Sequence, residues 1–342
     1  FPTPEPVIST AVSELLDGKT KYTRGQGSPA LCEAVAHHLM KTSNISVSPE
    51  NVLITPGAKQ ALLYSYMTVL NPSDEAILLS PSWASYEPMI SIIGGVPVNV
   101  PVDRKNFHPD MDAIRSSITD RTRMIMVNSP CNPTGAVYTR EEIEEIVSIA
   151  IEHDLWIISD EIYSRLIWNG GEHVSPATIE GGKERTIVIS GWSKTWAMTG
   201  MRVGFLAGPE QAVRAAVKCQ ANSASHIPTF MMEAARVALD CDDHVERFSD
   251  AYRHRRNLIV QGLEDIPGLR IVNPEGAFYL FIDVTGTGMS DVQFADGALK
   301  AGVQLIPASL ITGGEGFIRV SYAASEEDIK EGINRLRSWL LE

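Results

Sequence analysis

Short apolar runs alternate with amphipathic stretches between about residues 50 and 210. Several runs are apolar at nearly every position, which is typical of strands buried on both faces. The runs cover residues 52–54, 76–79, 96–100, 123–127, 155–159, 186–189 and 202–206. Stretches such as 59–70 and 140–153 have helical spacing, and Thr139 is an N-cap signal for the second. Because helical crossovers join parallel strands, we predict an α/β fold with a seven-stranded, mostly parallel sheet.

The pattern changes after about residue 225. Two long helical stretches come first, and strand candidates and a last helix follow, at 226–240, 245–263, 269–272, 277–284, 303–306, 316–321 and 325–341. Strands and helices are no longer in regular alternation here, which favours an α+β arrangement. We therefore predict a large domain over residues 25–225 and a smaller α+β domain that contains residues 226–342.

Composition narrows the class of protein. The chain has 342 residues, of which 44% are hydrophobic and 21% charged, as in soluble globular proteins. No apolar run is long enough for a membrane span. The formal charge of −13 argues against a nucleic-acid partner. Four cysteines without C-x-x-C spacing are typical of reduced thiols in a cytoplasmic protein, and no metal motif is present.

Lys194 follows the run at 186–189 and stands among small and aromatic residues between Ser190 and Gly204. A partly buried lysine has its charged form destabilised, so its pKa falls and its amine becomes nucleophilic, as Schiff-base chemistry requires. Arg202 lies eight residues later and is able to hold a phosphate through two hydrogen bonds. The ordinary alternative is a lysine in a solvated loop.

Other polar segments follow predicted strands, where ligands bind in α/β folds. They are Thr55 to Lys59, Ser80 to Trp83, Asn128 to Gly135 and Asp160 to Tyr163. Amides at the start of the helix over 59–70 form an anion site. Arg319 interrupts an apolar strand, and a charge there is costly unless it is paired. Taken singly, these features also fit a helix cap, a turn, a packed tryptophan and a structural ion pair.

In this order, the segments resemble the class I/II (fold type I) aminotransferases, the aspartate aminotransferase-like family, over about residues 1–340. The resemblance implies the cofactor pyridoxal 5′-phosphate, with Lys194 as the Schiff-base lysine that also acts as general base and acid. It implies that Asp160 pairs with the pyridine nitrogen, that Tyr163 and Asn132 bind the phenolic oxygen, and that Trp83 stacks on the ring.

The resemblance also implies the remaining contacts of the site. The cofactor phosphate meets a cradle made of Gly57, Ala58, Lys59, Ser190, Ser193, Arg202 and, from the neighbouring subunit of a homodimer, Tyr22. Arg319 binds the substrate α-carboxylate, beside Asn132 and Trp83, and Lys59 approaches an acidic substrate side chain in some branches. Residues 1–24 join the small domain. Gly191 departs from the pattern, because the family often has Ser or Thr there.

The implied function is ping-pong transamination between an L-amino acid and a 2-oxo acid, with an acidic, aspartate-like or an aromatic donor. Two alternatives stay open. One is a pyridoxal-phosphate lyase that catalyses β-elimination, because the fold does not settle the reaction. The other is a non-catalytic regulatory domain that senses the cofactor, although no basic helix-turn-helix is visible.

Overall fold

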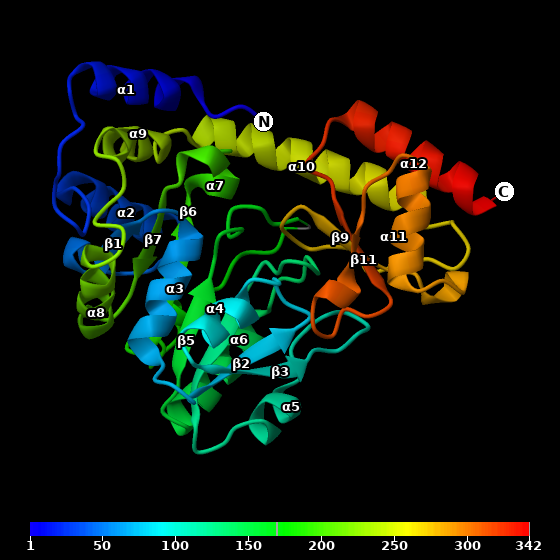
Figure 1. Ribbon diagram of the computed structural model, residues 1–342, viewed down its shortest axis with the longest axis horizontal. Coiled ribbons are helices and arrows are strands. Elements are labelled where there is room, and N and C mark those ends of the chain that lie inside the picture. Colours follow the sequence, from blue (N-terminus) through cyan, green and yellow to red (C-terminus); the bar gives the residue numbers. More distant parts are fainter. Residues whose placement is uncertain (169, 342) are drawn as a thin grey trace.

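The computed structural model describes residues 1–168 and 170–341. Its larger sheet has seven strands in the order β1-β7-β6-β5-β4-β2-β3 (Figure 1). β7 is antiparallel to both of its neighbours, and the other pairs are parallel, so the predicted α/β sheet is confirmed. The strands are β1 Val52–Thr55, β2 Glu75–Ser80, β3 Val96–Pro101, β4 Thr122–Asn128, β5 Trp156–Asp160, β6 Thr186–Gly191 and β7 Gly204–Ala207.

Helices cover both faces of this sheet, and alternate strand residues point to the two layers. Leu53 of β1 packs in the layer that contains α3 Ala58–Val69, α4 Tyr86–Ile92 and α8 Glu210–Ala221. Val52 and Ile54 pack in the opposite layer with α2 Pro29–Ser43 and α9 Phe230–Ala238. Further along that face lie α5 Met111–Ser116 and α6 Arg140–Glu152. Burial on both faces explains why these strands are nearly all apolar.

A second, antiparallel sheet has the order β10-β11-β9-β8. Its strands are β8 Arg270–Ile271, β9 Tyr279–Asp283, β10 Ile306–Pro307 and β11 Phe317–Ser321. Three helices lie beside it on the right of Figure 1: α10 Asp242–Leu263, α11 Asp291–Lys300 and α12 Glu326–Leu341. The strand expected at 303–306 begins only at Ile306, because residues 303–305, which follow the turn at 301–302, form no strand.

The chain passes between the two cores within α10. Val245 packs in the core of the large sheet, whereas Phe248 packs in the core beside the second sheet. The first helix, α1 Glu5–Leu16, packs against α9, while the ring of Phe1 stacks on Phe248 at 4.3 Å. The division into domains near residue 225 stays a prediction. Among the described residues, no helix has the length and apolar character needed to cross a membrane.

A histidine between two carboxylates joins the two sheets. His108 follows β3, and its Nδ1 lies 2.8 Å from Oε1 of Glu142 in α6. Its Nε2 lies 3.3 Å from Oε2 of Glu275, in the segment that leads into β9. The same Glu275 oxygen accepts a hydrogen bond from the Val137 amide at 2.9 Å. A protonated His108 therefore links α6 to the segment that leads into the second sheet, and Glu275 links that segment to the loop after β4.

This histidine gives the fold a pH dependence. The hydrogen bond to Glu142, and then that to Glu275, raises the pKa of His108 to about 9 from a usual value of 6.5. Because the folded chain holds this proton more tightly, the stabilisation is complete below about pH 6.5 and is lost as the pH rises through about 9. We expect the free energy of unfolding to fall by roughly 1–3 kcal/mol over that window, measured by urea unfolding. An equal fall in His108→Gln would contradict this assignment.

Candidate active site

A cavity of about 340 Å³ opens where strands β4 and β5 end. Ligands bind at this edge in open α/β sheets, because helices and loops leave a crevice there. Arg319 and Tyr279 reach the cavity from the second sheet. The lining residues are Ala58, Lys59, Leu62, Trp83, Tyr86, Asn128, Asn132, Asp160, Ile162, Tyr163, Ser193, Lys194, Thr199, Arg202, Tyr279 and Arg319.

Lys194 lies on the short helix α7 Trp192–Thr195, directly after β6. The Trp192 indole anchors this helix by donating to the Ala235 carbonyl at 2.8 Å. Burial lowers the pKa of Lys194, and the positive charge of Arg319 lowers it further, against the opposing effect of Asp160. The amine therefore loses its proton more readily than an exposed lysine, which is what a nucleophile and general base need.

Gly191, just before α7, has a packing reason to be glycine. An added Cβ would lie 2.9 Å from the Gly204 Cα atom and from the Val203 carbonyl oxygen. Real Cβ atoms almost never approach other heavy atoms so closely, and both neighbours are backbone that cannot rotate away. Close pairing of β6 with β7 therefore excludes the Ser or Thr that the family resemblance leads one to expect at this position.

Asp160 ends β5 and is 4% exposed. One carboxylate oxygen accepts from the Tyr86 hydroxyl at 2.8 Å and the other from the Ile162 amide at 3.2 Å. Burial raises the pKa of Asp160 to about 6. A buried carboxylate of this kind is stabilised as an anion by a cation placed in the cavity, so it suits a protonated ring nitrogen.

The loop after β4 is fixed to the same strand end. Asn128 donates its side-chain amide to the Asp160 carbonyl at 3.0 Å, and its Oδ1 accepts from the Asn132 backbone amide at 2.9 Å. Asn132 in turn accepts from Arg319 Nη1 at 3.1 Å. The loop therefore connects the carboxylate on the large sheet to the guanidinium on the second sheet.

The N-terminus of α3 and Arg202 form an anion site. Gly57 caps α3 with φ 83°, which presents the Ala58 and Lys59 amides at the helix start. Arg202 has a left-handed backbone (φ 54°), which is why β7 begins at Gly204 and not at 202 as expected. A Cβ on Gly57 would lie 2.5 Å from Arg202 Nη2. Glycine there lets the guanidinium approach the helix amides, which suits a phosphate.

Two further cations line the cavity. Arg319 of β11 lies 4.9 Å from the Tyr279 ring centroid, and the Tyr279 hydroxyl lies 2.9 Å from that of Tyr163. Lys59 Nζ donates to the Ser85 hydroxyl at 3.3 Å and lies 4.8 Å from the Trp83 ring centroid. The cavity therefore has cationic groups for a phosphate and for more than one carboxylate.

Three predicted residues lie outside the cavity lining. Gly57 lies behind Arg202. Ser190 donates to the Glu161 carbonyl at 3.4 Å, and Tyr22 is 92% exposed beside His226. Their proposed phosphate contacts stay predictions.

Six lining residues were not predicted from the sequence: Leu62, Tyr86, Asn128, Ile162, Thr199 and Tyr279. Asn128, Ile162 and Thr199 lie inside the polar segments described in the sequence analysis, and this position was the only feature of the sequence that could have indicated them.

The residues present fit pyridoxal phosphate: a buried carboxylate for the ring nitrogen, an anion site for the phosphate and a lysine of lowered pKa. The family described as Aminotransferase class I and II matches residues 3–336. The aspartate/prephenate aminotransferase of Thermus thermophilus is 39% identical over 340 residues, covering 98% of this chain and 87% of that one. Aromatic-amino-acid aminotransferase 2 of Thermococcus litoralis is 39% identical over 349 residues, covering 100% and 90%.

Two solved aminotransferase structures also superpose closely on this chain. The Thermus thermophilus aspartate aminotransferase with maleate superposes with a TM-score of 0.95 at 39% identity, covering 99% of this chain and 89% of that one. The aromatic aminotransferase from Pyrococcus horikoshii superposes with a TM-score of 0.97 at 37% identity, covering 100% and 93%. The chain therefore belongs to the class I and II aminotransferases, enzymes that depend on pyridoxal phosphate.

Proposed function

We propose that this chain transfers the amino group of an L-amino acid to a 2-oxo acid in two half-reactions. The observation that carries the proposal is the convergence of Lys194, Asp160, Arg202 and Arg319 on one cavity. When bound, pyridoxal phosphate supplies an electron-accepting ring that stabilises the charge left when the substrate loses its α-proton. The protein has to hold that ring, orient the substrate and move the proton.

Each of these tasks has a residue in the cavity. The Arg202 guanidinium and the α3 amides bind phosphate, and the Asp160 carboxylate holds the proton on the ring nitrogen. Arg319 binds the substrate α-carboxylate, which aims the Cα–H bond. Lys194 Nζ takes the proton from the substrate Cα as general base. It then donates that proton, as general acid, to the cofactor carbon that keeps the amino group.

A single-turnover assay separates transamination from β-elimination. An amino acid given alone should release one equivalent of 2-oxo acid per site and then stop until a second 2-oxo acid is added. Steady release of pyruvate and ammonia from a β-substituted substrate, without amino transfer, would replace the proposal by the lyase. No reaction of either kind would favour a cofactor-sensing domain.

An acidic donor is the substrate class that the cavity favours. Lys59 and Arg319 line the same cavity, so a dicarboxylate has a cation for each end. The Thermus thermophilus neighbour was solved with maleate, itself a dicarboxylate. An aromatic donor is the second candidate, because Trp83, Tyr86 and Tyr279 also line the cavity and a similar relative is named for aromatic amino acids.

Replacing Lys59 by methionine tests this choice. Methionine keeps the aliphatic stem and removes the charge, so a distal carboxylate loses its partner while an aromatic side chain does not. We expect kcat/KM for aspartate to fall about 30-fold, mainly through KM, and that for phenylalanine to change less than about threefold. Initial rates with both donors measure the split. Equal effects on the two donors would remove Lys59 from substrate recognition.

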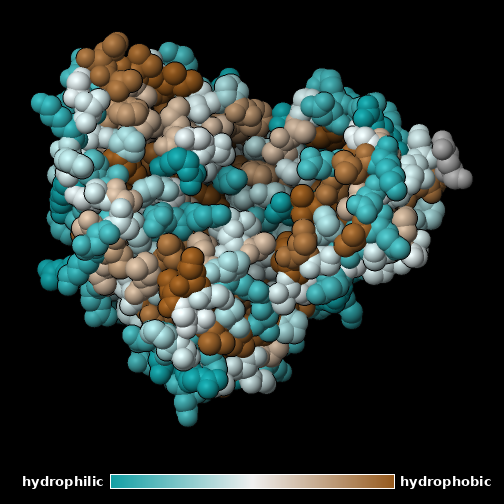
Figure 2. All heavy atoms as spheres, in the orientation of Figure 1, coloured by the Kyte–Doolittle hydropathy of each residue, from teal (hydrophilic) through white to brown (hydrophobic). Residues whose placement is uncertain are grey.

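We further propose a cytoplasmic homodimer. Tyr22 is almost fully exposed, and it would reach the phosphate of a neighbouring subunit. The outward face of α1 carries an apolar patch of Ile8, Val12, Leu15 and Leu16, seen in brown over α1 in Figure 2. Patches of this kind often mark interfaces. The cytoplasmic location is supported by four cysteines that form no disulfide within residues 1–168 and 170–341.

Sedimentation and a point variant test the dimer. We expect the active holoenzyme to sediment as a dimer, and Tyr22→Phe to raise the dissociation constant of the cofactor about three- to tenfold through loss of one hydrogen bond to phosphate. Measuring cofactor release by dialysis gives that constant. An active monomer would contradict the assembly, and unchanged cofactor affinity would contradict the role of Tyr22.

A further inference from the structure

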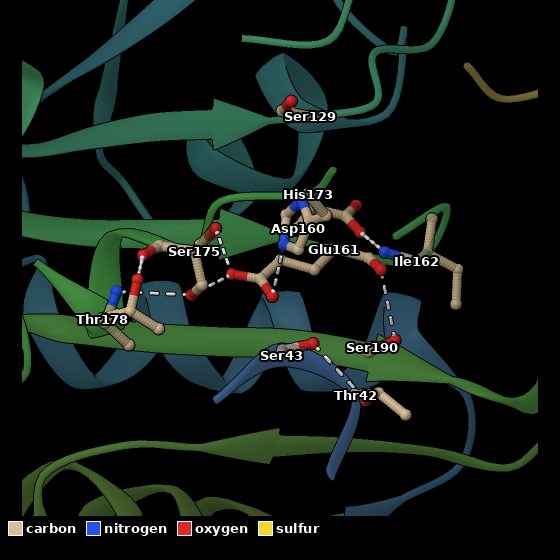
Figure 3. Close-up of polar contacts among 12 residues, drawn as sticks. Thr42, Ser43, Ser129, Asp160, Glu161, Ile162, His173, Ser175, Thr178 and Ser190 are labelled. Atoms are coloured by element: carbon tan, nitrogen blue, oxygen red, sulfur yellow. Dashed lines mark hydrogen bonds and ion pairs between the residues drawn. The ribbon is translucent and has the colours of Figure 1, made fainter. Parts of the chain in front are cut away.

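A second buried carboxylate lies directly behind the site. Glu161 follows Asp160 and is 2% exposed, but Asp160 lines the cavity and Glu161 does not. Its Oε1 accepts from the Ser175 hydroxyl at 2.5 Å and from the Ser159 hydroxyl at 2.8 Å. Its Oε2 lies 2.8 Å from His173 Nε2, an ion-pair distance without hydrogen-bond alignment (Figure 3).

These partners come from a different part of the chain from the site. His173 and Ser175 belong to the connection between β5 and β6, which folds back onto the strand end. Ser175 also accepts from the Ala177 amide, so it caps the short helix Pro176–Thr178 while it holds Glu161. A carboxylate this deeply buried is costly unless it is paired, so the connection and the strand end are held together through Glu161.

The backbone of Glu161 is held equally firmly. Its amide donates to the Ile189 carbonyl of β6 at 2.8 Å, and its carbonyl accepts from Ser190 Oγ at 3.4 Å and from the Ser164 amide at 3.0 Å. The next amide, that of Ile162, is the one that binds the Asp160 carboxylate. Fixing Glu161 therefore fixes the peptide that orients Asp160, as the chain of contacts in Figure 3 shows.

We propose that Glu161 is a positioning residue: its carboxylate, anchored by Ser159, His173 and Ser175, locks the Asp160–Ile162 turn and so aims the Asp160 carboxylate at the cofactor ring. Glu161 touches neither substrate nor cofactor in this role. The inference rests on the proposed function of Asp160 as the partner of the ring nitrogen. It adds a requirement that the site residues alone do not reveal.

If Glu161 acted on Asp160 through its charge alone, Glu161→Gln would change cofactor affinity in the opposite direction. Burial raises the pKa of Asp160, and the negative charge of Glu161 raises it further. Glu161→Gln removes that charge, so a purely electrostatic role predicts a more stable Asp160 anion and tighter cofactor binding. A positioning role predicts weaker binding, because glutamine has only one acceptor oxygen and its NH2 group cannot replace the carboxylate oxygen that lies beside His173. Ser175→Ala keeps the charge and removes one anchor.

The experiment follows cofactor dissociation from the holoenzyme by dialysis, and the pH at which the visible absorbance of the bound cofactor changes. We expect the dissociation constant to rise about tenfold in Glu161→Gln and about threefold in Ser175→Ala, with a displaced absorbance midpoint in both. Glu172→Gln is the matched control, since it removes an exposed carboxylate one residue before His173 and should change neither readout.

Each outcome supports or overturns the positioning role. Dissociation constants within about twofold of wild type in both variants, with an unchanged midpoint, would overturn the proposal even if the variants unfold at lower temperature. Tighter binding in Glu161→Gln would replace positioning by a charge effect. If Glu161→Gln does not fold, the dissociation constant and midpoint of Ser175→Ala decide between these outcomes. Asp160→Asn distinguishes a failure of the proposed function from a failure of the positioning role. If it leaves cofactor binding unchanged, the proposed role of Asp160 is wrong, whatever Glu161 does.

Discussion

A Lys194→Ala variant is expected to lose at least about 10⁴-fold in kcat and to bind the cofactor without a covalent bond. Lys194 has two tasks in the proposed reaction, covalent attachment and proton transfer, and alanine performs neither. Steady-state rates and the loss of the cofactor's visible absorbance band measure the two tasks separately.

Lys194→Arg is the matched control for charge. Arginine keeps the positive charge beside Asp160, but its guanidinium does not deprotonate in proteins. We therefore expect it to be as inactive as the alanine variant, whereas replacement of the exposed Lys218 should leave the rate unchanged. Either Lys194 variant retaining more than about 1% of the wild-type rate would mean that another group moves the proton.

The large sheet could be predicted because burial on both faces leaves a direct mark on sequence. β5 and its neighbours have buried residues at nearly every position, so a run of apolar residues corresponds to a strand. The same rule failed at Arg202, where an apolar run follows a residue whose left-handed backbone delays the strand. Two-residue strands such as β10 have too few positions to show any period.

The site was partly visible because its residues stand in short segments at strand ends. Asp160 and Lys194 could be proposed from such segments, together with the family resemblance. Their partners were not visible, because contacts between distant residues leave no local pattern. Tyr86 binds Asp160 from 74 positions away, and Tyr279 meets Tyr163 from 116 positions away. The anchoring of Glu161 by Ser175 is also set by the folded connection and not by any spacing.

Asp160→Asn is expected to lower kcat by about 10³-fold while keeping the shape of the site. Asparagine matches aspartate in size and still accepts one hydrogen bond, but it cannot carry the negative charge that keeps the ring nitrogen protonated. Half-reaction rates with a saturating amino acid measure the loss. A decrease smaller than about tenfold would show that the ring does not depend on this carboxylate.

The same substitution should stabilise the cofactor-free protein. Burial raises the pKa of Asp160 to about 6 from its ordinary 3.8. A raised carboxyl pKa means that the folded state holds the proton more tightly than the unfolded chain, so stability falls as the pH rises from about 4 to about 6. Asparagine removes that cost, and we expect the variant to gain roughly 1–3 kcal/mol near pH 7.5 but little near pH 4.

Urea unfolding with and without cofactor is therefore expected to show opposite effects of Asp160→Asn on the free energy of unfolding. Without cofactor, Asp160→Asn should be the more stable protein at neutral pH. With cofactor, wild type should gain more, because a ligand stabilises the folded state in proportion to how tightly it binds. If the variant is less stable in both states, Asp160 is a structural carboxylate. If the signs are opposite, the fold bears the cost of a buried charge because the cofactor's ring offsets it.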